Sequence, residues 1–232
     1  MKMKPTIISM LLLIASIASA SPCFKLPRNF QPLPPTGSVA VIVVVSPTPA
    51  LWLPLEQWRV LSPDEMNQVN EELAQDLVLG LQSKGVDAKA LGSSADALVY
   101  RTKGRICANP NEAELIKSQV SEIVKTASLD SAIAVRLMVH RQQYHKMHMN
   151  QFVNREEAIV AKDGSMPLLY TANGEVHVIS KDGHYLNYFL ELNSWGVKKV
   201  GNNQYKILNR SEWLAELSSQ LLTTLNVRSA GK

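Results

Sequence analysis

The chain of 232 residues is 46% hydrophobic and 19% charged, with 11 Gly and 12 Pro, a composition that excludes collagen-like and low-complexity disordered proteins. Its formal net charge is +4, and removing the two lysines of the predicted leader leaves 22 basic and 20 acidic residues. A balance this close to neutral argues against nucleic acid as a partner.

Residues 1–20 have the pattern of a secretory signal peptide. Two lysines precede an apolar run over residues 7–15, and Ala18-Ser19-Ala20 supplies the small residues of a cleavage site. The run is too short for a membrane span, which needs ~20 apolar residues. The sequence therefore predicts cleavage near Ala20 and a periplasmic or secreted protein without an integral membrane span.

Residues 21–37 carry five prolines and predict an extended arm. Cys23 lies in this arm, and Cys107 is the other cysteine of the chain. In an oxidising compartment two thiols of one chain usually pair, so we expect a Cys23–Cys107 disulfide that ties the arm to the body. No lipid anchor is expected at Cys23, because Pro22 stands where a lipobox has Gly or Ala.

Residues 38–232 predict a single α/β domain. Its first element is a strand over residues 39–45, whose continuous β-branched run is typical of a strand buried on both faces of a sheet. The prolines that follow force a loop that carries Trp52 and Trp58. These aromatic side chains either pack on the body or form a contact surface.

Three helices are predicted by capping signals that precede apolar residues at helical spacing. The first begins at Ser62, where Glu65 completes a capping box, and ends at Gly85. The second begins at Asn109 and the third at Asn209. Asn209-Arg210-Ser211 also matches a glycan acceptor, but a helix start is the favoured interpretation.

Elsewhere apolar residues recur at every second position, which predicts a short strand at residues 86–91 and a longer one through residues 133–139. Later strands should be separated by tight turns, because Asn-Gly and Asp-Gly dipeptides supply the positive φ of hairpins. The expected turns are Asp163-Gly164, Asn173-Gly174, Asp182-Gly183 and Asn202-Asn203. The sequence thus predicts an α/β (α+β) sandwich, with a mixed sheet of about five strands, an antiparallel meander and three packed helices.

No short catalytic motif is present, since the sequence lacks G-x-S-x-G, G-x-G-x-x-G, a Walker loop and H-E-x-x-H. Glu156 and Glu157 are adjacent and would face opposite sides of a strand, and Gly92-Ser93-Ser94 has no visible base. We therefore expect no enzymatic activity and no cofactor. A hydrolase assembled from distant residues is an open alternative.

All five histidines lie between residues 140 and 184. Six His and Met residues fall within twelve positions: Met138, His140, His145, Met147, His148 and Met149. Thioether and imidazole ligands together suit copper. On a strand His145, Met147 and Met149 would share one face, so a site needs a cross-strand ligand such as His177 or His184. Ordinary strand packing is the favoured interpretation, and a periplasmic copper-type metal-binding protein is the alternative.

Aromatic and basic residues also gather near residue 200. Trp195 precedes Lys198 and Lys199, and Tyr205 precedes Lys206. Aromatics beside cations can bind glycans or phosphate-rich partners. An exposed hairpin end explains the same residues and is favoured.

The layout resembles small bacterial envelope accessory domains. The strand at residues 39–45 with its capped helix, residues 129–135 entering a long strand, residues 174–178 and the C-terminal amphipathic helix carry the resemblance. These domains include the TolB amino-terminal domain, the curli secretion lipoprotein and the lipoprotein activator of penicillin-binding proteins. The resemblance covers residues 38–227. This chain departs from that pattern by lacking a lipobox and by its His/Met cluster.

The resemblance implies a domain without catalytic residues that docks onto a partner or helps to assemble an envelope machine. Together with the missing motifs, it predicts an exported, non-enzymatic envelope accessory or assembly protein that acts through protein–protein contacts. The expected partner is an envelope or secreted protein. The candidate contact surfaces are the arm, the Trp52–Trp58 loop and the hairpin ends.

Overall fold

The computed structural model describes residues 37–47, 58–92, 96–99, 108–143, 168–190, 196–201 and 204–225. In chain order, its elements are β1 (Ser38–Pro47), β2 (Trp58–Val60), α2 (Pro63–Gln82), β3 (Asp87–Ala90), the 3-10 helix η2 (Asp96–Leu98), α3 (Pro110–Thr126), β4 (Ser131–Gln143), β5 (Leu168–Ser180), β6 (Tyr185–Leu190), β7 (Val197–Gly201), β8 (Gln204–Ile207) and α5 (Arg210–Thr224). No helix within these ranges is both long and apolar enough to cross a membrane.

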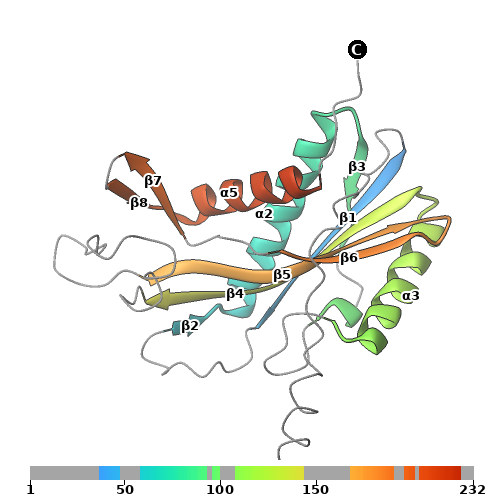
Figure 1. Ribbon diagram of the computed structural model, residues 1–232, viewed down its shortest axis with the longest axis horizontal. Coiled ribbons are helices and arrows are strands. Elements are labelled where there is room, and N and C mark those ends of the chain that lie inside the picture. Colours follow the sequence, from blue (N-terminus) through green and yellow to red (C-terminus); the bar gives the residue numbers. More distant parts are fainter. Residues whose placement is uncertain are drawn as a thin grey trace, which may run out of the picture.

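Six strands form one mixed sheet (Figure 1). The order is β3-β1-β4-β5-β6, and β2 pairs with β4 just beyond the end of β1. Strand β1 runs parallel to both β3 and β4, whereas β4, β5 and β6 form an antiparallel meander. Strands β7 and β8 form a separate hairpin. The predicted α/β sandwich with a mixed sheet, a meander and three helices is confirmed.

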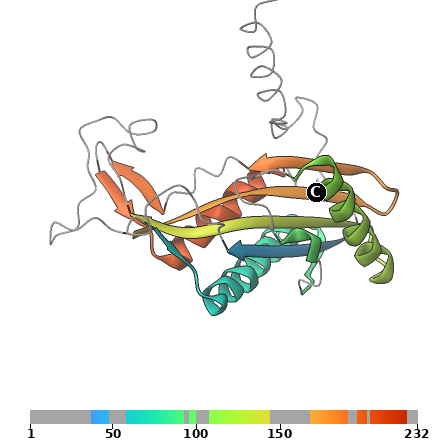
Figure 2. The same ribbon diagram turned by 90° about the horizontal axis from the view of Figure 1, so that it is seen from below.

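The two central strands are buried on both faces. Val41 and Ile42 of β1 face opposite sides, and both are fully buried, as predicted from the β-branched run. One face packs against α2 and α5, which contact each other and cross in Figure 1, and the other packs against α3. Figure 2 shows β1, β4, β5 and β6 succeeding one another across the sheet.

Each α-helix begins at the capping residue that the sequence predicts. The side-chain oxygens of Ser62, Asn109 and Asn209 accept the N3 backbone N–H, and the N3 glutamate accepts the N–H of the capping residue in return. Two of the unpaired N–H groups at each helix start are thereby satisfied.

The turn predicted at Asn173-Gly174 is wrong, because both residues lie inside β5, which pairs with β4 without interruption. A Cβ at Gly174 would lie 2.2 Å from the Arg136 carbonyl oxygen, so this glycine permits close strand packing. The turn at Asp182-Gly183 is confirmed, with Gly183 at φ +83° between β5 and β6. Asn202-Asn203, between the paired β7 and β8, and Asp163-Gly164 lie outside the described residues.

Several other predictions fall outside the described residues. These include the signal peptide, the arm up to residue 36, both cysteines of the predicted Cys23–Cys107 disulfide, and Trp52. They remain predictions from the sequence.

Candidate functional site

The order of the strands creates a switch point at the carboxyl end of β1. The chain passes from β1 through α2 to β3 on one side, and then through α3 to β4 on the other side. Because these two connections lie on opposite faces of the sheet, they diverge above β1. In α/β sheets, ligands bind outside the carboxyl ends of strands at such a point.

Strand β1 continues beyond its neighbour β3 at this end. The register between them stops at Val41 and Ala90, and one further hydrogen bond joins the Leu91 N–H to the Val41 carbonyl. Strand β1 extends to Pro47 and remains paired with β4 on its other side. Within the described part of the chain, the β3 side of β1 therefore has no strand partner beyond this point.

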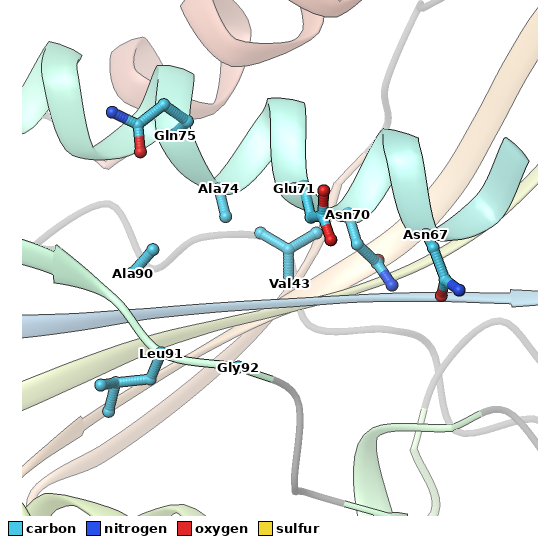
Figure 3. A pocket seen from close by; sticks show the side chains of 9 residues that line it. All are labelled: Val43, Asn67, Asn70, Glu71, Ala74, Gln75, Ala90, Leu91 and Gly92. Atoms are coloured by element: carbon cyan, nitrogen blue, oxygen red, sulfur yellow. The ribbon is translucent and has the colours of Figure 1, made fainter. Parts of the chain in front are cut away.

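A groove of about 330 Å³ lies over this stretch, between α2 and the end of β3. Its lining residues are Val43, Asn67, Asn70, Glu71, Ala74, Gln75, Ala90, Leu91 and Gly92. Figure 3 shows Asn67, Asn70 and Glu71 projecting from one side of α2 near Val43, with Leu91 and Gly92 across the groove. We call this feature the α2–β1 groove.

Amide side chains dominate the polar chemistry of the groove. Asn67, Asn70 and Gln75 each carry both donors and acceptors, and Glu71 is the one ionisable residue among the nine that line it. Asn70 Oδ1 accepts the Val45 backbone N–H at 2.6 Å. A side chain of α2 therefore satisfies a main-chain group on the edge of β1 that no described strand covers, which we call the free edge of β1. A neighbouring strand would otherwise supply a carbonyl at this position.

The other face of the sheet holds a buried polar cluster at the same level. Arg136 stands beside Val44 of β1 and opposite Glu175 of β5, and both side chains are at most 2% exposed. Arg136 Nε lies 3.1 Å from Glu175 Oε1, which also accepts the Ala108 N–H at 2.7 Å. Burial raises the pKa of Glu175, while the Arg136 charge and the Ala108 N–H favour the carboxylate.

His177 completes this cluster from the next inward position of β5. Its Nδ1 lies 2.9 Å from the Tyr185 hydroxyl, and its Nε2 lies 3.9 Å from Glu175 Oε2. Burial, and then the charge of Arg136, lower the pKa of His177 to about 3, so its ring is neutral near pH 7. Burial also raises the pKa of Tyr185, which keeps the phenol protonated and able to donate to Nδ1.

The cluster is a fixed element of the fold and not part of the groove. Arg136, Glu175 and His177 point to the α3 face, whereas the α2–β1 groove lies on the α2 face, so the sheet separates them. The bond from Ala108 also joins β5 to the residue that precedes the Asn109 cap of α3. The cluster thereby holds the start of α3 against β4 and β5.

The structure describes only part of the predicted His/Met cluster. Met138 and His140 are buried on β4, and His177 belongs to the polar cluster just described. His184 is exposed beside the turn before β6. His145, Met147, His148 and Met149 lie outside the described residues, as do Glu156 and Glu157. Among the residues that are described, no three His, Cys, Asp or Glu side chains come together as a metal site would need, and the copper alternative remains a prediction.

Two basic residues near residue 200 are engaged by α5. Lys198 forms an ion pair with Glu216 at 3.0 Å, and Lys206 forms one with Glu212. These contacts tie the β7–β8 hairpin to α5. Trp195, the aromatic residue of the same predicted patch, is outside the described residues.

Sequence analysis missed the polar residues of the α2–β1 groove. Asn67, Asn70, Glu71 and Gln75 recur at helical spacing beside the apolar stripe of α2. Such a stripe is usually a solvated helix face, and only the sheet order places it beside a strand edge. No family model matches the sequence, and a search of curated proteins returned no relative.

Proposed function

We propose that this chain is an exported, non-enzymatic accessory or assembly protein, and that it binds a protein of the envelope or of the secreted fraction through the α2–β1 groove. The observation that carries this proposal is the position of the groove. It lies along the second half of β1, beyond the carboxyl end of β3, where the connections to β3 and β4 diverge, and it is bordered by a strand edge.

The chemistry of the lining supports a protein partner. Three amide side chains and the free edge of β1 offer paired donors and acceptors, which match the alternating N–H and C=O groups of a polypeptide. Val43 and Ala74 add apolar surface. Export and the absence of catalysis come from the sequence: the leader pattern of residues 1–20 and the resemblance to envelope accessory domains support them.

Site-specific photo-crosslinking in the organism that makes the protein tests this proposal. A photoreactive residue is placed at Gln75, which is exposed at the groove, and as a control at Leu79, which is 54% exposed one turn further along α2. We expect a discrete adduct from position 75 that excess unlabelled chain competes away and that position 79 does not give. The crosslinked protein is then purified and its affinity is measured with wild-type chain.

Equal crosslinking from both positions, or none from position 75, would contradict the proposal. The same strains test export directly, because removal of residues 2–20 should leave the protein in the cytoplasm. If the truncated chain were still found in the exported fraction, the signal-peptide prediction would be contradicted.

A further inference from the structure

We infer that the partner enters the α2–β1 groove as an extended segment that adds to the free edge of β1 as a strand, with a basic side chain placed against Glu71. This inference rests on the proposed function and specifies the chemistry of the partner. It makes the contact a case of strand addition, in which main-chain hydrogen bonds supply much of the affinity.

The backbone of β1 already presents the required groups. The Val41 carbonyl accepts a hydrogen bond from Leu91, so this main-chain group points toward β3. Side and main chains of a strand alternate with a period of two, so Val43 and Val45 direct their main-chain groups to the same side. The Val45 N–H does so, because it donates to Asn70 Oδ1. The incoming strand would continue the line of β3 past Ala90.

In this structure Asn70 takes the position that a strand partner of Val45 would have. A buried N–H without an acceptor is costly, and the 2.6 Å bond from Val45 to Asn70 removes that cost. An incoming carbonyl can take over this N–H while the Asn70 amide turns to the peptide backbone. The exchange conserves hydrogen bonds, which keeps the edge protected when no partner is present and available when one arrives.

The negative charge of Glu71 favours a basic side chain on the entering segment. Glu71 is exposed, and no basic residue is among the nine that line the groove. A Lys or Arg on the entering segment would meet a carboxylate that no described lining residue neutralises, whereas an acidic residue would be repelled. An exposed pair of this kind is worth about two- to fivefold in affinity, which suits it to select register more than to provide binding strength.

A small polar ligand such as a sugar would use the same amides, but it would not need the strand edge. The free edge of β1 therefore favours a polypeptide. The two occupants differ in one measurable respect: strand addition requires peptide N–H groups at every second residue, and side-chain recognition does not.

The experiment selects binders for the full-length purified chain from a random heptapeptide display library. Two selected peptides are synthesised with a fluorophore, and each backbone N–H is replaced in turn by N-methyl. Anisotropy titration should show affinity losses of about tenfold or more at alternate residues and small changes between them. In parallel, Glu71→Gln should weaken binding of basic peptides about two- to fivefold. Asp76→Asn, on the same helix but outside the groove lining, should leave it unchanged.

Three results would each overturn strand addition. They are affinity losses on N-methylation that do not recur at every second residue, equal effects of Glu71→Gln and Asp76→Asn on binding, and failure of the peptides to compete with the crosslinked partner. A groove crosslink from position 75 combined with such a result would leave the proposed protein contact intact. Absence of that crosslink would remove the proposed function, whatever the peptides do.

Discussion

Arg136 and Glu175 form a charged pair in a place that water does not reach. Both side chains lie within the sheet–α3 layer, and the carboxylate also accepts the Ala108 N–H. Removing two charges from water is costly, and their attraction repays that cost only with good geometry and further hydrogen bonds. The arrangement therefore fixes the register of β4 against β5 more than it adds net stability.

The first prediction concerns the loss of one partner. Glu175→Gln should lower the free energy of unfolding by about 3–5 kcal/mol, because it removes the carboxylate charge that lies against the buried Arg136 guanidinium. The double variant Arg136→Met/Glu175→Leu should recover most of this loss, since it removes both charges. Urea denaturation of wild type, Glu175→Gln and the double variant measures the recovery, and a double variant as unstable as Glu175→Gln would contradict the prediction.

The second prediction concerns acid. His177 binds a proton in the native state only near pH 3, whereas in the unfolded chain it does so near its ordinary pKa of 6.5. The unfolded state therefore takes up more protons as the pH falls below about 6.5, and the native state loses stability there. Between pH 7 and pH 5 this group alone should cost about 2 kcal/mol.

Unfolding free energies of wild type and His177→Gln at pH 7 and pH 5 test the acid prediction. The variant should lose about 2 kcal/mol less than wild type over this interval. Glu175 titrates with the opposite sign, since its pKa is raised, but it is common to both proteins. His184→Gln, at an exposed turn position, is the control and should behave as wild type. An unchanged slope in His177→Gln would contradict the assignment.

At the scale of elements, β5 shows why a local signal can fail. Asn173-Gly174 has the composition of a hairpin turn, but thirteen residue pairs join β4 to β5 across it. The glycine has a different role here, because the backbone at Gly174 approaches the Arg136 carbonyl too closely for any side chain. A glycine inside a strand pattern has two explanations, a turn or a close approach, and only the neighbouring strand distinguishes them.

The third prediction follows from that contact. Gly174→Ala should destabilise the protein by at least about 2 kcal/mol, because its Cβ would lie 2.2 Å from the Arg136 carbonyl oxygen and 2.7 Å from Leu137 Cδ2. Gly92→Ala is the control, since no heavy atom lies within 4 Å of the corresponding Cβ. Thermal unfolding of both variants measures the difference, and similar melting temperatures would refute the close-approach explanation.

Helix boundaries were predictable because capping is local chemistry. Ser62, Asn109 and Asn209 each bond within three residues of themselves, so the sequence alone contains both partners. The α2–β1 groove was not predictable in this way. Its residues come from α2, β1 and β3, and only the order β3-β1-β4 brings the amides of α2 to an unpaired strand edge.

For the whole molecule, the sandwich class follows from periodicity: β-branched runs buried on both faces require helices on both sides of the sheet. The polar cluster escaped prediction, because Arg136, Glu175 and His177 alternate with apolar residues as any half-exposed strand would. Their burial depends on α3, η2 and Ala108, which lie over this face of the sheet. Sequence patterns thus predicted the layers but not which polar residues lie between them.

The last prediction tests whether the two layers unfold together, as a single domain over residues 38–232 requires. Strands β1 and β4 are shared, since adjacent residues such as Val41 and Ile42 belong to opposite cores and both are fully buried. A loss of stability in the α3 layer should therefore also destabilise the α5 layer, because the two layers share the sheet. Ile116→Ala removes a fully buried side chain of α3 and should cost about 2–5 kcal/mol.

Residue-resolved hydrogen exchange under native conditions provides the measurement. In Ile116→Ala the protection of Leu217 in α5, which is fully buried on the far face, should fall by the same free energy as that of Val120 in α3. Leu115→Ala, at the adjacent position that is 53% exposed, should change neither. If only α3 lost protection, the layers would be separate cooperative units, and the sheet would hold two half-domains whose stabilities are set independently.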